Sequence, residues 1–284
     1  MTIQWHDLDR VAPLSGLYTK AALLRKVSGK QLPDTGLRAW LAVDNQRLAD
    51  YREVCGLGGG SLLPLTYPHV MAFALQMQLL TDHDFPFPLL GLVHLSNRIR
   101  VLRPLGGLSR VHASVHVENL RPHEKGVTFS LVTRIEDTLG PLWEEDSVML
   151  CKGVHLDGAV ATEVQAGAAP MIEQARWYAG SDCGRKYAKV SGDYNPIHLS
   201  AVSARLFGFP AAIAHGMFSL ARALAALREQ LPAANIELQV QFRKPVRLPS
   251  EVVLWASAGG SSGQFELKGK GELSHMAGQW SPVA

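Results

Sequence analysis

The 284-residue chain has only three cysteines, and Cys55, Cys151 and Cys183 lie far apart in the sequence. An odd number of widely spaced cysteines makes neither a disulfide framework nor a zinc-binding pattern. We therefore expect three small, buried thiols in a reducing compartment, which predicts a cytoplasmic protein.

Long hydrophobic runs are also missing. No apolar stretch approaches the roughly 18 residues that a membrane-spanning helix needs. The first seven residues, MTIQWHD, show neither the basic nor the apolar region of a signal peptide. We expect no membrane span and no secretion signal.

Charge is scarce and nearly balanced. Charged residues make up 19% of the chain, and 28 Lys and Arg against 25 Asp and Glu give a net charge of +3. Because no block of Lys or Arg stands out, nucleic acid is not expected as a partner. Hydrophobic residues make up 47%, which is enough for a sizeable core and argues against disorder.

The most informative stretch covers residues 187–198 and reads YAKVSGDYNPIH. It places Asp193 and His198 five residues apart, across a turn of Gly, Asn and Pro. A carboxylate and an imidazole at this spacing can face one reacting water, so they form a candidate general acid/base pair. Asn195 lies between them. Its amide could fix the water or orient a partner, or it could be a turn residue before Pro196.

An internal repeat relates this stretch to the first half of the chain. Residues 51–62, YREVCGLGGGSL, align with residues 187–198 at a constant offset of 136. Leu57 and Leu62 then stand at the positions of the acid and the base, so the first copy lacks the polar pair. Two further matches follow in the same order: residues 68–75 with 214–220, and residues 94–104 with 238–247.

The repeat predicts two domains of ordinary size. We expect a first half (residues 1–155) that has lost the acid/base pair and a second half (residues 171–284) that carries it. Residues 156–170 are rich in small residues and are predicted to be a linker.

Each half is predicted to contain one long apolar helix followed by strands. The first half has a helix at 66–80 and strands at 91–102, 109–119, 127–137 and 141–150. The second has a helix at 214–231, ended by Pro232, and strands at 236–242, 251–258 and 264–270. One central helix with several antiparallel strands indicates a sheet wrapped around a helix.

At this point the residues resemble a known family. The pattern Y-x-x-V-S-G-D-x-N-P-I-H-x5-A, followed by A-H-G-M at 214–217, is similar to the hydratase-2 motif of MaoC-like (R)-specific enoyl-CoA hydratases and dehydratases. The duplicated layout resembles the actinobacterial double-hotdog 3-hydroxyacyl-thioester dehydratases. The diagnostic part covers about residues 187–247. The resemblance implies an α+β double hotdog, with two antiparallel sheets that are each wrapped around a long central helix.

The resemblance also implies an activity, the reversible hydration of trans-2-enoyl thioesters to (R)-3-hydroxyacyl thioesters in fatty-acid metabolism. Asp193 and His198 match the family's catalytic positions. Gly216 would open the second apolar helix and offer backbone N–H groups to the thioester oxyanion. No cofactor is expected, because CoA or the pantetheine of an acyl-carrier protein arrives with the substrate. A homodimer of double hotdogs is the expected assembly.

Besides Asn195, four residues are candidates for substrate binding. Arg243 and Lys244 lie in a basic strand and could meet CoA phosphates or an acidic carrier protein, or they could be a solvated strand edge. Leu57 and Leu62, with their apolar neighbours, could hold the acyl tail, or they could be core residues only.

Other polar residues are given structural roles. His215 precedes an apolar helix, and His69 occupies the like position in the half without the pair, so we expect both to be structural. His112 and His116 share a strand face but lack further ligands, so no metal is expected. Residues 82–84, DHD, are interpreted as a solvated turn.

Two other classes of function stay open. One is a non-catalytic subunit that binds acyl thioesters, which the intact Asp193 and His198 count against. The other is a hotdog thioesterase, which usually places a carboxylate on or near the helix, and residues 214–226 contain none.

Overall fold

Strands dominate the computed structural model, which describes residues 2–24, 26–160 and 169–283. In these residues the strands are β1 (Gln4–Leu8), β2 (Thr35–Ala42), β3 (Val93–Val101), β4 (Arg110–His123), β5 (Gly126–Asp137), β6 (Gly140–Lys152), β7 (Ile172–Ala179), β8 (Ile236–Phe242), β9 (Ser250–Ala256), β10 (Gly263–Lys268) and β11 (Ser274–Ser281). They form one sheet in the order β1-β2-β4-β5-β6-β3-β8-β11-β10-β9-β7.

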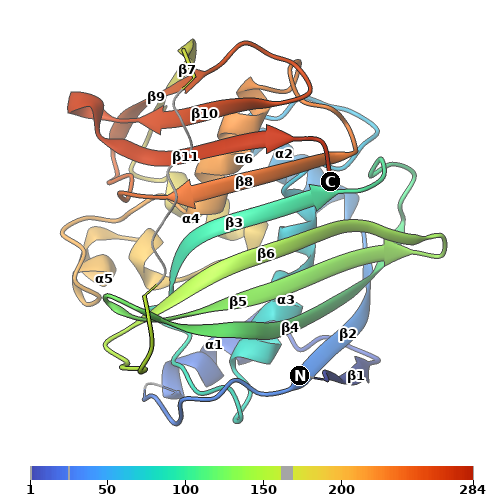
Figure 1. The fold of residues 1–284 in the computed structure, drawn as a ribbon, viewed down its shortest axis with the longest axis vertical. Coiled ribbons are helices and arrows are strands. Elements are labelled where there is room, and N and C mark those ends of the chain that lie inside the picture. The colour runs from blue at the N-terminus through green and yellow to red at the C-terminus, as the bar shows by residue number, and fades with distance from the viewer. Residues whose placement is uncertain (1, 25, 161–168, 284) are drawn as a thin grey trace.

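The helices pack behind this sheet in the view of Figure 1. The α-helices are α1 (Leu14–Leu23), α2 (Asn45–Cys55), α3 (Tyr67–Leu80), α4 (Cys183–Ser191), α5 (Ala201–Arg205) and α6 (Gly216–Ala226), and two short 3₁₀ helices are η1 (Pro196–His198) and η2 (Lys270–Glu272). The apolar helices α3 and α6 are buried along most of their length. They are the two central helices that the sequence predicts.

The expectation of two separate antiparallel sheets is wrong. The two halves share a single sheet, because β3 of the first half pairs antiparallel with β8 of the second. Ile99 lies opposite Leu238 in this pair, and both side chains are fully buried. The joint satisfies backbone groups that two free sheet edges would leave unpaired. The sheet is also not purely antiparallel, since β1 runs parallel to β2.

The repeat has a structural counterpart in α2 and α4. Both helices end in a glycine in the left-handed conformation, Gly56 with φ 65° and Gly192 with φ 86°, where a side chain would be strained. Tyr51 and Tyr187 are both buried, and their ring centroids lie 6.1 Å apart. Residues that align at the offset of 136 thus form equivalent helix-to-loop turns in the two halves.

The predicted elements match the observed ones unevenly. β8 has the predicted bounds, and α3 begins at Tyr67, one residue later than expected. α6 spans only Gly216–Ala226 instead of 214–231, because the chain turns after Leu227 and reaches Pro232 outside the helix. The predicted linker at 156–170 falls largely on residues 161–168, which lie outside the described residues.

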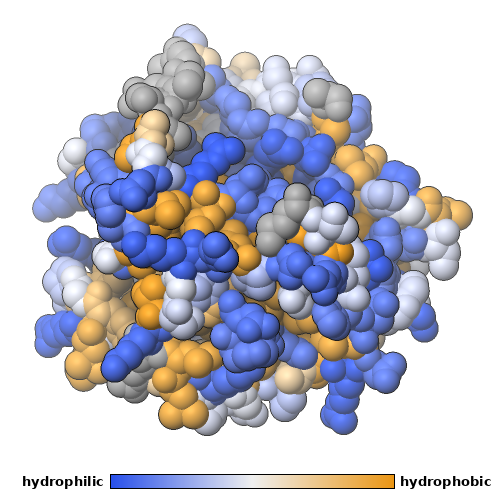
Figure 2. Space-filling view, turned by 60° about the horizontal axis from the view of Figure 1, so that its bottom comes forward, coloured by the Kyte–Doolittle hydropathy of each residue, from blue (hydrophilic) through white to orange (hydrophobic). Residues whose placement is uncertain are grey.

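The surface is mixed in character. Figure 2 shows hydrophobic patches separated by hydrophilic side chains. All three cysteines are buried and free, as the sequence predicts. Among the helices that the structure describes, none combines the length and the apolar composition needed to cross a membrane.

Candidate active site

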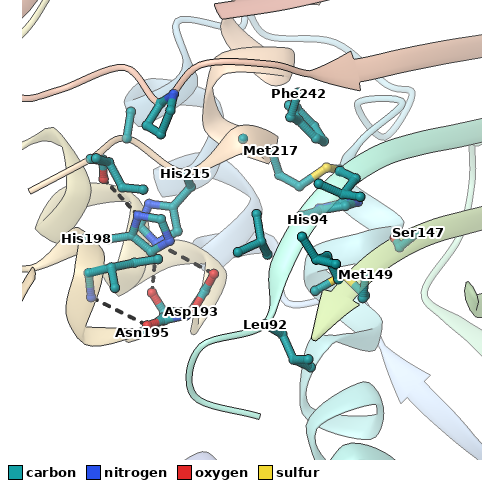
Figure 3. A pocket seen from close by; sticks show the side chains of 18 of the residues that line it. Leu92, His94, Ser147, Met149, Asp193, Asn195, His198, His215, Met217 and Phe242 are labelled. Carbon is teal, nitrogen blue, oxygen red and sulfur yellow. Dashed lines mark hydrogen bonds and ion pairs between the residues drawn. The ribbon is translucent and has the colours of Figure 1, made fainter. Parts of the chain in front are cut away.

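The loop after α4 positions the predicted pair. Gly192 ends the helix, and the carboxylate of Asp193 then accepts a hydrogen bond from the Asn195 backbone N–H at 3.0 Å. The Asn195 side chain accepts in turn from the Ile197 N–H at 3.4 Å and caps η1. These two turns bend the backbone tightly, and the bend brings His198 back beside Asp193 (Figure 3). In this structure Asn195 therefore has the turn role, and it also lines the cavity described below.

His198 is held in one orientation. Its Nδ1 lies 2.8 Å from the Ile213 carbonyl, so Nδ1 carries the proton and Nε2 is left as the base in the neutral ring. The backbone of His198 packs directly against Gly184 of α4, where an added Cβ would lie 2.0 Å from the His198 carbonyl oxygen. Only glycine fits at that point of the helix.

His215 lies closer to the pair than the sequence suggests. Its ring stacks on His198 with centroids 3.7 Å apart, and its Nε2–H donates to the Asp193 backbone carbonyl at 2.9 Å. Nε2 is also 3.7 Å from the Asp193 carboxylate. Burial and the neighbouring His198 lower the pKa of His215 to about 3, so the ring is neutral. His215 therefore contacts both members of the pair and fixes their relative position.

The electrostatics of the pair are set by burial and mutual attraction. Burial lowers the pKa of His198, and the charge of Asp193 only partly opposes this. Burial works to raise the pKa of Asp193, but His215 and His198 outweigh it and hold that pKa below its usual range. Near neutral pH the carboxylate is ionised and the imidazole is neutral, so both groups are in their basic forms.

The pair opens onto a cavity of 480 Å³, which is within the range of about 300–1,000 Å³ typical of ligand sites. Gly216, Met217 and Phe242 of the second half line one side. The first half supplies the opposite wall, as Figure 3 shows for Leu92, His94 and Met149. Further apolar lining comes from α3 and β5, namely Phe73, Met77, Leu80 and Leu131.

Exposed basic residues from both halves also line the cavity. Arg243 and Lys244 are two of them, and Arg243 pairs with Glu266 at 3.3 Å. Lys125 and Lys152 of the first half join them, although they lie in no basic run that the sequence would reveal.

Leu57 and Leu62 are placed away from this cavity. Neither is among its lining residues, and Leu62 is 37% exposed and forms a bridge with Gly106. Leu57 packs against the hydrophobic core. The loop after α2, which corresponds to the loop after α4, runs toward Gly106, and Leu62 pairs with that residue. The two leucines therefore fill the positions of the acid and base in sequence but not beside the substrate cavity.

Two side chains of the first half hold the loop that carries Asp193. Arg47 of α2 donates to the carbonyls of Val190 and Ser191 at 2.7 and 2.6 Å, which caps the end of α4 with a positive charge. Tyr18 of α1 donates to the Gly192 carbonyl at 3.0 Å and accepts from the Tyr194 N–H at 2.6 Å. Sequence reasoning missed both, because more than 140 residues separate each from its partners.

The same three side chains are also candidate metal ligands. Asp193, His198 and His215 can bring one ligand atom each within 4.8 Å of one another. However, the His215 Nε2 is already engaged by the Asp193 carbonyl. The exposed group of Asp82, His83 and Asp84 forms its own ion pairs at 2.9 and 3.0 Å, consistent with a solvated turn.

Known proteins are similar to this chain in sequence and in fold. Residues 162–277 match the family described as "MaoC like domain". The chain is 35% identical to "3-hydroxyacyl-thioester dehydratase X" of Mycobacterium tuberculosis over 229 residues, which cover 80% of this chain and 81% of that one. The crystal structure of HtdX from the same organism gives a TM-score of 0.77 at 32% identity and covers 87% of this chain and 100% of the other.

A more distant structure supports the fold alone. A MaoC-like dehydratase from Phytophthora capsici gives a TM-score of 0.72 at 19% identity and covers 91% of this chain and 97% of the other. Taken with the relative above, these matches show that the chain belongs to the MaoC-like dehydratase family. The resemblance drawn from the motif is confirmed, and the chain is a hydro-lyase homologous to 3-hydroxyacyl-thioester dehydratases.

The Arg47 contacts give a first prediction. Arg47→Gln should lower the free energy of unfolding by about 1–3 kcal/mol, because two helix-end carbonyls lose a charged donor. It should also slow turnover, since the loop that carries Asp193 is no longer fixed. Thermal or denaturant unfolding measures the first effect and steady-state kinetics the second. Arg205→Gln, at an exposed position, is the control; equal stability of the two variants would contradict the capping role.

Proposed function

We propose that this protein catalyses the reversible hydration of trans-2-enoyl thioesters to (R)-3-hydroxyacyl thioesters in fatty-acid metabolism. The observation that carries the proposal is the placement of Asp193 beside His198, whose fixed tautomer leaves Nε2 free at a cavity built from both halves. The (R) stereochemistry is taken from the resemblance to the hydratase-2 group.

The basic forms of both groups favour one order of proton transfers. His198 Nε2 takes a proton from water as the water oxygen attacks C3 of the enoyl thioester. The imidazolium that forms is stabilised by the adjacent Asp193 carboxylate, which also accepts a hydrogen bond from the attacking water. His198 then delivers the same proton to C2, so the hydroxyl and the proton that are added both come from one water molecule.

The negative charge on the thioester oxygen needs a donor during this sequence. Gly216 is the first residue of α6, and the backbone N–H groups at a helix start are unpaired and lie at the positive end of its dipole. An added Cβ at Gly216 would lie 2.9 Å from the Phe242 ring. Glycine thus serves tight packing here, and we propose that it also lets the thioester approach the helix start.

The carrier part of the substrate would meet the basic residues of the cavity. Lys125, Lys152, Arg243 and Lys244 come from both halves and are exposed. Their charge suits the phosphates of CoA or an acidic acyl-carrier protein. The acyl tail would extend along the first-half wall, where Phe73, Met77 and Met149 offer apolar surface.

Incubation with crotonyl-CoA tests the proposal directly. Loss of the enoyl absorbance without release of free thiol, with an (R)-3-hydroxy product by chiral analysis, is expected. Thiol release would indicate a thioesterase. An unchanged substrate would indicate a binding subunit, and an (S) product would remove the hydratase-2 assignment.

Substitution of the pair gives the second prediction. Asp193→Asn and His198→Ala should each lower kcat/KM for crotonyl-CoA by at least about 100-fold, since a lost acid or base typically costs 10²–10⁴. The loss in the double variant should be much less than additive, because Asp193 acts by stabilising the imidazolium of His198 and the two groups work as a unit. Circular dichroism checks that each variant is folded, and near-normal activity in either single variant would refute the assignment.

The pKa shifts give the third prediction. The pKa of His198 lies below 6.5 and that of Asp193 below its usual range, so both groups are mainly in their basic forms at pH 6.5. The kcat/KM for hydration should therefore fall to half its maximum only below pH 6.5. A pH profile with half-maximal activity above pH 6.5 would contradict the order of proton transfers.

Chain-length preference gives the fourth prediction. Phe73 lines the cavity, whereas Leu75 on the same helix is fully buried in the core, so Phe73→Trp is the substitution that narrows the cavity. It should lower kcat/KM about 100-fold for a ten- to twelve-carbon enoyl-CoA, because each lost CH₂ contact is worth about 0.8 kcal/mol. Crotonyl-CoA should lose less than about fivefold.

Leu62→Trp is the matched control for this prediction. It enlarges an apolar residue of the first half outside the cavity and should leave chain-length preference unchanged. If Leu62→Trp and not Phe73→Trp impaired long substrates, the tail would follow the route that the sequence alone suggests.

A further inference from the structure

A buried polar cluster lies in the first half, against the cavity wall. Its centre is Glu145 of β6, whose side chain is 0% exposed. The Glu145 carboxylate accepts from His69 Nδ1 at 2.8 Å and from Asn97 Nδ2 at 2.7 Å. Gln76 Nε2 also approaches this carboxylate at 3.5 Å. Three elements, α3, β3 and β6, therefore meet at one buried charge.

Such a cluster is costly in a cavity that only has to hold hydrocarbon. A buried ion pair gives up the solvation of both partners, and apolar residues of similar volume are often as stable or more stable. The neighbouring lining residues Phe73, Met77 and Met149 show what a plain hydrocarbon wall looks like. The His69–Glu145 pair interrupts that wall, which points to a polar binding role.

One hydrogen-bonding atom of the cluster remains available to a substrate. Gln76 Nε2 donates to Thr133 at 2.9 Å, and the His94 Nε2 lies 3.4 Å from the Asn97 amide. His69 lines the cavity with its side chain 14% exposed, and no described residue bonds its Nε2. Glu145 outweighs the effect of burial and raises the pKa of His69, which favours a proton on Nε2.

The position of His69 limits what it can bind. Its ring centroid is 6.4 Å from that of Phe73 and 6.5 Å from that of His94, so it lies in the same stretch of the cavity wall as these two residues. Its charge also interacts with Asp193, which places the two groups in one electrostatic environment. A substrate atom that meets Nε2 would therefore lie on the part of the acyl chain that is nearer to Asp193 than the far end of a long tail is.

We propose that His69, held by Glu145, recognises an oxygen substituent on the acyl chain, such as a hydroxyl or a carbonyl group, so that the preferred substrates are oxygenated acyl thioesters. This inference rests on the proposed function and names the substrate class for the same site. A site with a buried donor discriminates strongly against a ligand that leaves the donor unpaired.

A substrate scan with the wild-type protein tests the proposal. Pairs of trans-2-enoyl-CoA substrates of equal chain length would carry either a hydroxyl group or plain methylene at one carbon, from the fifth to the eighth. We expect kcat/KM to be roughly tenfold to 100-fold higher for the hydroxylated member at one position of the scan. Ratios within threefold of one at every position would overturn the proposal.

The double variant His69→Phe/Glu145→Leu tests which residues are responsible. Removing both charges avoids leaving a buried carboxylate unpaired, and thermal unfolding checks that the variant folds. The preference for the hydroxylated substrate should vanish or reverse in favour of the plain chain. An unchanged preference would overturn the assignment to this pair. If the variant does not fold, the wild-type scan still decides the substrate class.

His112→Phe is the control. His112 also pairs with a glutamate, Glu136 at 2.9 Å, but on β4 and outside the cavity. Its substitution should leave the preference unchanged. Failure of the proposed function is seen separately, because then the wild-type protein would hydrate neither member of any pair nor crotonyl-CoA.

Discussion

The antiparallel pairing of β3 with β8 is the constraint on which the rest of the structure depends. It joins the two halves into one sheet and places α3 and α6 on the same side of it (Figure 1). Because the two halves meet there, the cavity beside the start of α6 is bounded by residues of the first half and does not open to solvent on that side. A single half would lack one wall of the cavity and the side chains that hold the catalytic loop.

Burial at this joint also sets the chemistry. Asp193, His198 and His215 lie so close that Asp193 changes the proton affinity of both imidazoles and both change that of Asp193. The cost of keeping the carboxylate ionised is offset by the two imidazoles and by the Asn195 backbone N–H of its own turn. The result is a base that is neutral at rest and has a fixed negative partner, which suits a reaction that takes up and returns one proton.

Sequence alone predicted the local parts of this picture well. Asp193 and His198 could be found because a short turn brings them together, and the family motif covers the same residues. The bounds of β8 follow from its alternating pattern. β7 and β11 were not predicted, and α6 was predicted too long because residues 227–231, LREQL, continue past its last turn without a Gly or Pro to end the helix.

The contacts between segments that are far apart in the sequence could not be predicted from the sequence alone. Nothing in the sequence distinguishes Arg47 from other helix arginines, because its role depends on the packing of α2 against α4. Glu145 looks like one more charged residue of its strand, since Glu144 beside it pairs with Arg100. Leu57 and Leu62 align in sequence with the polar pair, yet the loop that carries them leads away from the cavity. The residue types could be interpreted from the sequence there, but the path of the backbone could not be predicted from it.

The asymmetry of the two halves then has a physical explanation. The first half lacks the Asp–His pair at the aligned positions, but it completes the sheet and closes the cavity. Residues in it are then free to serve the active site of the other half: Tyr18 and Arg47 do so through hydrogen bonds to the catalytic loop. His69 is the counterpart of His215 in the repeat, but it turns to Glu145 instead of a catalytic aspartate. Equivalent positions of the repeat thus contact the Asp193–His198 pair in one half and line the cavity wall in the other.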